Sequence, residues 1–407
     1  MTFMNITFNK NIPESVRRVI NMAALLAVAG VLGVIGGAIG SAFAKSISLV
    51  TALRDTHGYL IYLLPVGGLA SVALYKLTKT DDIGTNRVIE SAHGEKATPV
   101  ILIPVIFIAS VITHLFGGSA GKEGAALQLG GGTAELISGI VRADQKTKRI
   151  LTICGMAAFF SAVFGTPFGA IVFAVEVTAV GGINLAAIVP AVVSGIAAYG
   201  ISTLFGVSHE SFHIADLPPH DVLTILKAAA IAVIVSLAAN GFCRLLEGGK
   251  KLSSKAVKNP FIRIFVGGCI IIVLTLLFGT DYNGGGFFVV ERIFEEGTVR
   301  HEAFLLKIIF TVITISAGYK GGEIVPSFFI GATLGATLSG LFGLPMSYCA
   351  TIGMTAFFGG VTNCPIASAV IAIELFGIKG VVFFAIAAFA TRVFSGKVSL
   401  YNKQKTA

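Results

Sequence analysis

Charged residues are scarce in this 407-residue chain. Asp, Glu, Lys and Arg together make up 13% of it, whereas hydrophobic residues make up 55%. Ordinary globular domains carry about 25% charged residues, so no soluble domain of usual size fits beside this many apolar segments. The composition therefore predicts a polytopic membrane protein whose surroundings are the lipid bilayer.

Cysteine is also sparse, and its arrangement excludes several kinds of site. The five cysteines are odd in number and none has CxxC spacing. We interpret them as reduced packing residues, so no disulfide, metal or cofactor is expected. The net charge of +9 comes mostly from short loops and the chain ends, such as Arg17-Arg18 and residues 142–149. This distribution is typical of membrane orientation by the positive-inside rule, and no nucleic acid partner is expected.

Apolar runs fill both halves of the chain. The polar, proline-bearing stretch 206–221 is predicted to connect an N-terminal membrane half, 1–205, to a C-terminal membrane half, 222–407. Several runs are too long, or too interrupted by Gly and Pro, to be single straight helices, which is typical of transporters with discontinuous helices. The runs are 19–44, 58–76, 98–116, 125–141, 150–177, 183–206, 222–246, 261–279, 303–317, 325–343, 347–363 and 366–395.

The two halves repeat one another. The stretch 153–163 reads ICGMAAFFSAV, and 351–361 reads TIGMTAFFGGV. Glycine, proline and glutamate positions around these stretches also match at a nearly constant offset of about 200 residues. The matched pairs are Pro167 with Pro365, Glu176 with Glu374, and Glu123 with Glu323. Membrane repeats of this kind are commonly inverted, so we expect Glu123 and Glu323 to face the same small volume near the midplane.

The first glycine-rich loop, 117–124, contains a single acidic residue between two apolar runs. An ionisable side chain in such a place is costly to bury, so Glu123 is interpreted as functional. Glycines allow backbone N–H groups to approach an anion closely, and a helix over 125–138 would point its positive end at the same place. The loop is predicted to be an anion cradle that contains its own carboxylate.

Short motifs allow other interpretations of this loop. GGSAG at 117–121 fits the G-x-S-x-G pattern of serine hydrolases, but that pattern needs a preceding strand and His and acidic partners. A phosphate-binding loop needs one more residue before Lys122 and a Ser or Thr after it. Glu123 on a purely structural loop, or two glutamates that bind a coupling cation, are further alternatives. We expect a secondary ion transporter and no enzyme activity.

Several separated motifs resemble the CLC family of chloride channels and anion/proton exchangers. GKEG at 121–124 is similar to the family's G-[R/K]-E-G signature, and GGEIVP at 321–326 is similar to its G-G-I-F-A-P motif. The resemblance implies an all-α fold of two inverted-topology repeats with broken, tilted helices, and a homodimer. A cytoplasmic nucleotide-binding domain of the kind found in animal members is not expected here. The resemblance also implies that Glu123 gates the anion site and carries protons, and that Glu323 takes part in proton coupling. The implied anion-binding positions are Gly121, Lys122, Gly124, Gly322, Ile324, Val325, Tyr401, Thr85 and Asn86.

Three departures from the chloride exchangers favour the bacterial fluoride-exporting branch. The loop with the chloride-coordinating serine is missing, and 81–87 is the nearest stretch; Val177 follows Glu176 where an inner glutamate is usual; and Glu323 replaces a hydrophobic residue. We therefore expect a fluoride/proton antiporter in a bacterial inner membrane. A chloride channel or chloride/proton exchanger on the same scaffold is the alternative.

Further predictions concern two phenylalanines, two more glutamates and Val325. Fluoride holds its water tightly, and phenylalanine ring edges carry partial positive charge, so Phe328 and Phe329 are candidates for a fluoride site, although core packing explains them equally well. Glu176 and Glu374 close apolar runs and are expected to form caps or pairs. Val325 stands where the fluoride branch has a threonine.

Overall fold

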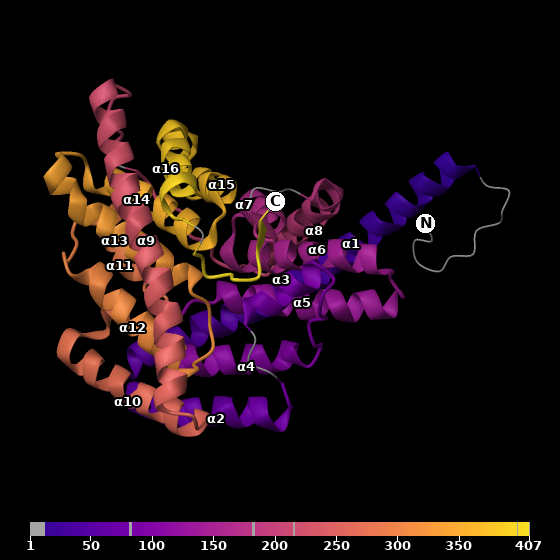
Figure 1. Ribbon diagram of the computed structural model, residues 1–407, viewed down its shortest axis with the longest axis horizontal. Helices are drawn as coiled ribbons and strands as arrows, with labels where there is room; N and C mark the ends of the chain where they lie inside the picture. The colour runs from indigo at the N-terminus through magenta and orange to yellow at the C-terminus, as the bar shows by residue number, and fades with distance from the viewer. Residues whose placement is uncertain (1–12, 81–83, 181–183, 215, 397, 407) are drawn as a thin grey trace.

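The computed structural model describes residues 13–80, 84–180, 184–214, 216–396 and 398–406, and these residues are nearly all helical (Figure 1). The first-half elements are α1 (Glu14–Thr56), η1 (Gly58–Leu63), α2 (Leu64–Leu77), α3 (Thr85–Ala92), α4 (Leu102–Leu115), α5 (Glu123–Ile140), α6 (Gln145–Phe164), α7 (Pro167–Glu176), β1 (Ala179–Val180) and α8 (Leu185–Leu204). The second-half elements are α9 (Val222–Ala256), α10 (Pro260–Phe278), η2 (Thr280–Tyr282), α11 (Phe287–Glu295), α12 (Ala303–Ala317), α13 (Ile324–Phe342), α14 (Met346–Thr362), α15 (Pro365–Phe376), η3 (Ile378–Gly380), α16 (Val381–Phe394) and β2 (Lys405–Thr406).

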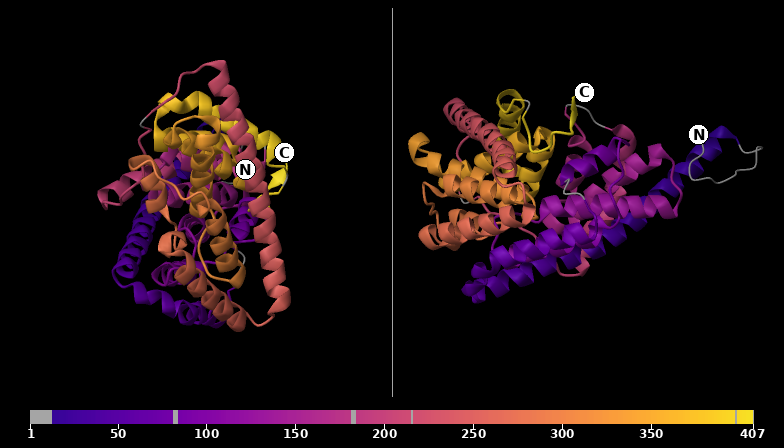
Figure 2. Two further views of the ribbon diagram at one scale, coloured as in Figure 1. Left: turned by 90° about the vertical axis from the view of Figure 1, so that its left-hand side faces the viewer. Right: turned by 60° about the horizontal axis from the view of Figure 1, so that its bottom comes forward.

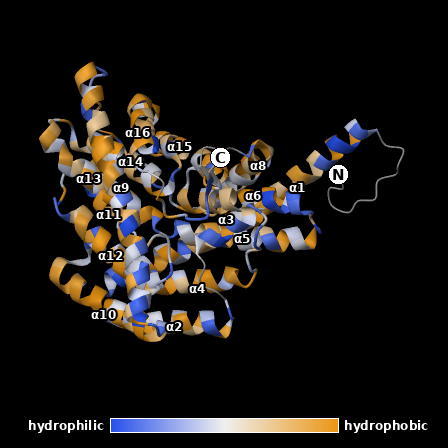
Figure 3. Cartoon of the chain, in the orientation of Figure 1, coloured by the Kyte–Doolittle hydropathy of each residue, from blue (hydrophilic) through white to orange (hydrophobic). Residues whose placement is uncertain are grey.

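Central and outer helices differ in burial. Seven helical segments of the described chain are long and apolar enough to cross a bilayer. In the apolar stretch of α6, 89% of the residues are buried within the protein, whereas in that of α10 only 28% are buried. Most of the α10 ribbon has the colour of hydrophobic residues in Figure 3. Because an exposed apolar helix is stable only against lipid, α10 belongs to the lipid-facing layer and α6 to the protein core.

A break between two consecutive helices recurs at equivalent places in the two halves. The run 150–177 breaks where α6 ends at Gly165, which has φ 83°, and α7 begins with Pro167. In the second half, α14 is closed by Asn363, with φ 56°, and α15 begins with Pro365. The predicted run 366–395 has a further break of its own, between α15 and α16. At both equivalent breaks, a left-handed residue closes the first helix and a proline then begins the next one.

Glycines allow the central helices of each half to cross closely. A side chain on Gly130 of α5 would lie 2.3 Å from the carbonyl oxygen of Gly155 on α6. In the second half, a side chain on Gly331 of α13 would lie 2.4 Å from the carbonyl oxygen of Gly353 on α14. The long helix α9 runs along one side of the molecule (Figure 2), packed against α12, α14 and α16.

The end of the chain returns to the first half. β2 pairs in parallel with β1, with Ala179 opposite Lys405. The Lys403 ammonium lies 2.9 Å from the Glu90 carboxylate on α3, and Lys405 lies 2.8 Å from Glu95. These contacts fix the position of the segment that contains Tyr401.

Candidate functional site

The two glycine loops meet at the centre of the molecule. The first connects α4 to α5 and the second connects α12 to α13. Gly121 N–H donates to the Gly322 carbonyl at 2.7 Å, and Gly322 N–H donates to the Gly121 carbonyl at 2.6 Å. This pair of hydrogen bonds brings the N-termini of α5 and α13 together, where their unpaired N–H groups and positive dipole ends favour an anion.

A third helix begins at the same place. Thr85 is the first residue of α3, and its hydroxyl donates to the Gly124 carbonyl at 3.3 Å. Gly84 before it has φ 62°, which favours glycine. Of the predicted stretch 81–87, residues 81–83 lie outside the described residues.

Glycine is required where the loops touch. A side chain on Gly322 would lie 2.4 Å from the Gly124 nitrogen, and one on Gly124 would lie 2.7 Å from the Gly322 α-carbon. One on Gly121 would lie 2.8 Å from Glu123 Oε2 and equally close to Val325 Cβ. The glycines therefore allow two backbones and the Glu123 carboxylate to share one small space.

The two loops align in space one residue away from the predicted register. Gly121 pairs with Gly322, an offset of 201 (322 − 121 = 201). The same offset relates Gly117 to Gly318, which both have positive φ after their helices, and Gly130 to Gly331, where the helix pairs cross. Glu123 is therefore equivalent to Ile324, and Glu323 is equivalent to Lys122. The sequence match of the two glutamates at an offset of 200 was wrong by one position.

Glu123 is the first residue of α5 and is completely buried. Neither of its carboxylate oxygens makes a hydrogen bond within the described chain. Burial without a partner strongly disfavours a charged carboxylate, whereas the nearby helix N-termini favour it. Its surroundings therefore act on its protonation state in opposite directions.

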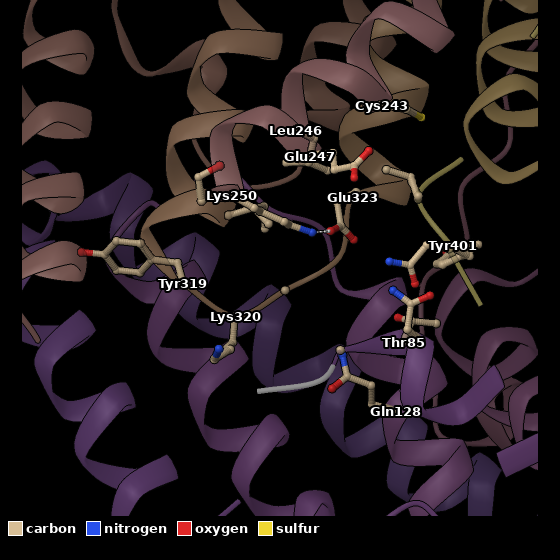
Figure 4. Close-up of a pocket in the computed structure, with 18 of the residues that line it drawn as sticks. Thr85, Gln128, Cys243, Leu246, Glu247, Lys250, Tyr319, Lys320, Glu323 and Tyr401 are labelled. Atoms are coloured by element: carbon tan, nitrogen blue, oxygen red, sulfur yellow. Dashed lines mark hydrogen bonds and ion pairs between the residues drawn. The ribbon is translucent and has the colours of Figure 1, made fainter. Parts of the chain in front are cut away.

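Glu323 lies in a different environment. It lines a cavity of about 390 Å³, which we call the Glu323 cavity, and Figure 4 shows its side chain pointing toward Lys250 of α9. The Lys250 ammonium lies 3.2 Å from Glu323 Oε1, and 16% of the Glu323 side chain is exposed. Glu123 is not among the residues that line this cavity. The two carboxylates make no direct hydrogen bond to each other.

Several predicted anion-binding residues face the same cavity. Tyr401 lines it and is only 3% exposed, so its ring does not act as an anchor at the headgroup level. Thr85 and Asn86 also line it, and Asn86 Oδ1 accepts from Lys403 N–H at 3.3 Å. Gln128 was not predicted: it lines the cavity and donates to the Gly124 carbonyl at 3.3 Å. Gln128 is a polar residue in an apolar run, one helical turn after Gly124, and this position could have identified it as a residue of the site.

The remaining candidates have structural positions. Lys122 is half-buried at the N-cap of α5, and Ile324 and Val325 are buried at the start of α13. Ser119 is buried, and its hydroxyl lies 3.1 Å from the Thr311 hydroxyl. No strand precedes it in the described chain, so the hydrolase pattern lacks its required context.

Phe328 belongs to a stack of aromatic rings between the two halves. Its ring lies 5.3 Å from that of Phe164 and 4.9 Å from that of Phe358, nearly parallel to both. Phe173 continues the cluster from Phe358 to Tyr401. Phe329 points elsewhere, with the ammonium of the fully buried Lys307 5.0 Å from its ring.

Glu176 and Glu374 cap each other's helices, which agrees with one of the expected roles. Glu176 accepts from the N–H groups of Ile366 and Ala367 at 3.1 and 2.7 Å, at the start of α15. Glu374 accepts from Phe168 and Gly169 at 3.0 and 2.6 Å, at the start of α7. Each carboxylate satisfies free N–H groups and faces a positive helix end, so both roles are structural.

Known proteins share this architecture over nearly the whole chain. The model of the family described as voltage gated chloride channel matches residues 66–396. A chloride/fluoride channel protein of Pseudomonas syringae pv. tomato is 33% identical over 402 residues, which is 97% of this chain and 89% of that protein. The H(+)/Cl(-) exchange transporter ClcA of Cronobacter sakazakii is 25% identical over 382 residues, 86% of this chain and 82% of that protein.

A solved structure extends the comparison to the fold. The crystal structure of a CLC-type fluoride/proton antiporter superposes with a TM-score of 0.92 at 33% sequence identity, covering 95% of this chain and 99% of that one. Together with the converging helix N-termini and the buried glutamate, these matches establish that the chain is a multi-pass membrane protein of the voltage gated chloride channel family.

Proposed function

We propose that this protein is a proton-coupled fluoride exporter, which expels fluoride and admits protons. One observation carries the proposal: Glu123, fully buried and with no hydrogen-bond partner for its carboxylate among the described residues, lies where the N-termini of three helices meet. The 33% identity to a chloride/fluoride channel protein and to a fluoride/proton antiporter of known structure supports fluoride as the anion.

Competition between the carboxylate and the anion couples the two fluxes. An ionised carboxylate and a fluoride ion are both small acceptors of charge-assisted hydrogen bonds, so they compete for the same N–H donors. Protonation of Glu123 removes its charge and frees these donors for the anion. Loss of the proton returns the carboxylate and expels the anion. Exchange of the two ions follows from this exclusion, and transport should accelerate as the pH falls.

The proton route differs from that expected of a chloride exchanger. Val177 follows Glu176 and has no group that can relay a proton, and both oxygens of Glu176 are occupied in capping α15. Glu123 therefore has to exchange protons with both aqueous faces itself. Glu323 is the carboxylate that receives them on the cavity side, where it is partly exposed beside Lys250.

The site suits an ion that has to be stripped of water. Fluoride needs many close donors to replace its hydration shell, and the meeting point of α3, α5 and α13 supplies backbone N–H groups from three helices. The edges of the stacked Phe164, Phe328 and Phe358 rings are a further source of partial positive charge. We place the protein in a bacterial inner membrane as a homodimer whose subunits each have their own pathway.

Flux from vesicles tests the proposal. Liposomes that contain the purified protein are loaded with fluoride, potassium and valinomycin, in weak buffer, and external fluoride and pH are recorded. We expect fluoride to leave while protons enter, so that the external pH rises, and an equal chloride load to move few protons. Chloride that passes as readily as fluoride would instead support a chloride channel or exchanger.

A further inference from the structure

A second cavity of about 370 Å³ lies between the end of α2 and the start of the lipid-facing helix α10. We call it the basic pocket. It is lined by Val72, Tyr75, Lys76, Lys79, Thr80, Pro260, Arg263, Ala317, Gly318 and Lys320. Four of these side chains are cationic, and the described lining includes no Asp or Glu; Asp81 and Asp82 follow Thr80 and lie outside the described residues. Such a concentration of positive charge is suited to an anionic group.

Two of the cations, Lys76 and Arg263, keep their capacity to bind an anion. The Lys76 ammonium lies 4.6 Å above the Phe261 ring, a contact that leaves its positive charge in place. Among the described residues Arg263 makes one long hydrogen bond, 3.5 Å from Nη1 to the Val257 carbonyl, and its buried Nε makes none. A guanidinium with unused donors is a strong partner for a phosphate group.

The N-terminus of α10 adds to this field. Pro260 is its first residue, and the Asn259 side chain accepts from Phe261 N–H at 2.9 Å. The positive end of this 19-residue helix therefore lies beside the pocket, where it favours negative charge.

An apolar surface continues from the pocket along α10. Ile262, Phe265, Val266, Ile270 and Val273 are exposed at helical spacing, each by at least 42%. This stripe begins next to Arg263, and α2 packs alongside α10 (Figure 1). A ligand with a phosphate head and acyl chains would bind both features at once, whereas a soluble anion would use only the pocket.

The pocket lies at the cytoplasmic level of the membrane. Basic residues gather at this end of the chain's helices, namely Lys76, Lys79, Lys251, Lys255 and Lys258, whereas the 279–286 connection at the other end of α10 contains only one charged residue, Asp281. By the positive-inside rule, the basic end faces the cytoplasm.

We propose that the basic pocket binds the headgroup of an anionic phospholipid of the inner leaflet, with the acyl chains along α10. Arg263, Gly318 and Lys320 line both this pocket and the Glu323 cavity. A lipid phosphate that engages Arg263 therefore lies next to the cavity from which the transported anion enters. The proposal concerns binding and does not depend on which anion is transported.

Lipid titration of the purified full-length protein in neutral detergent tests this. Phosphatidylglycerol and phosphatidylcholine are added separately, and bound lipid and thermal unfolding are measured by native mass spectrometry and by fluorescence. Phosphatidylglycerol should bind more tightly and raise the Tm more. Two cations near a membrane surface contribute about 1 kcal/mol each, so the K76Q/K79N double variant should bind phosphatidylglycerol about thirtyfold more weakly. Lys79 has φ 50°, which asparagine tolerates.

Three controls accompany the lipid titration: phosphatidylcholine, the K255Q variant and soluble phosphates. The double variant should keep the wild-type Tm in phosphatidylcholine, which shows that it folds, and K255Q, an exposed lysine at the same end outside the pocket, should bind phosphatidylglycerol as the wild type does. Equal loss in K255Q would indicate diffuse surface attraction and overturn the proposal. Equal stabilisation by glycerol phosphate or inorganic phosphate would overturn the assignment to lipid, as would unchanged lipid binding in the double variant.

Discussion

The two glycine loops have the same arrangement of glycines and an acidic residue, yet their glutamates lie in opposite environments. Glu123 is fully buried and its carboxylate oxygens make no hydrogen bond within the described chain, whereas Glu323 is partly exposed in a cavity and forms an ion pair with Lys250. The difference arises from one residue of register. Glu123 is the first residue of α5, whereas Glu323 is the N-cap of α13.

Structural equivalence sharpens this contrast. At the offset of 201, Glu123 corresponds to the apolar Ile324, and Glu323 corresponds to the oppositely charged Lys122. Successive helical residues point about 100° apart, so a shift of one position turns a side chain to a different face. The fold therefore uses the same backbone arrangement twice, once to hold the fully buried Glu123 carboxylate and once to hold the partly exposed Glu323 carboxylate.

The largest effect is expected when the buried Glu123 carboxylate is replaced by a group that cannot ionise. Glu123→Gln keeps the shape of the side chain but cannot ionise, so fluoride-driven proton flux should fall about 100-fold or more. Vesicle flux with pH recording measures this. Glu295→Gln, which changes an exposed carboxylate at the end of α11, is the control and should transport normally.

A second variant separates transport from stability at this position. Glu123→Ile copies the equivalent Ile324, so it removes a buried polar group that lacks a partner. It should unfold at a higher temperature than the wild type while losing proton coupling. A native rate of proton movement in either Glu123 variant would show that this carboxylate is not the coupling group.

A smaller effect is expected where the two loops touch. In Gly322→Ala the new methyl group would lie 2.4 Å from the Gly124 nitrogen, a backbone atom that has little room to move. The free energy of unfolding should fall by about 1–3 kcal/mol, as for other overpacked sites. Gly139→Ala in α5 is the control, because nothing lies within 4 Å of the added methyl group, and alanine should stabilise that helix by about 0.5–1 kcal/mol. Equal Tm shifts in both variants would contradict close packing of the loops.

Much of this arrangement was predictable from sequence, because it depends on residues with distinctive backbone behaviour. The helix breaks at Pro167 and Pro365 and the repeat that relates them follow from glycine and proline positions. The register of the loops was not predictable, since either of two adjacent glycines, Gly321 or Gly322, matches Gly121 in the sequence. Lys250 was also missed, because an exposed lysine on a long helix gives no sequence signal of its partner 73 residues away.

The reciprocal caps give a test of the symmetry itself. Glu176→Ala and Glu374→Ala each remove an acceptor for two helix N–H groups, so each should lower the free energy of unfolding by about 1–2 kcal/mol. Because the two caps are equivalent, the two losses should be similar, and fluoride flux per folded protein should stay near the wild-type rate. Unfolding of detergent-solubilised protein measures the losses. A strong defect in coupling in only one of them would assign that glutamate a role in proton transfer.

The smallest effect is expected at Lys250, which forms the ion pair with Glu323. Lys250→Met removes a half-exposed cation from the Glu323 cavity, and such an ion pair contributes only about 0.2–1 kcal/mol to stability. Its positive charge should instead concentrate anions near the cavity, so fluoride flux at low ionic strength should fall roughly two- to fivefold, with the difference vanishing at high salt. Lys251→Met is the matched control, because the neighbouring Lys251 pairs with Glu247 and does not line the cavity. A salt-independent loss would mean that Lys250 acts by positioning Glu323, since a fixed local contact is screened far less than an approaching ion.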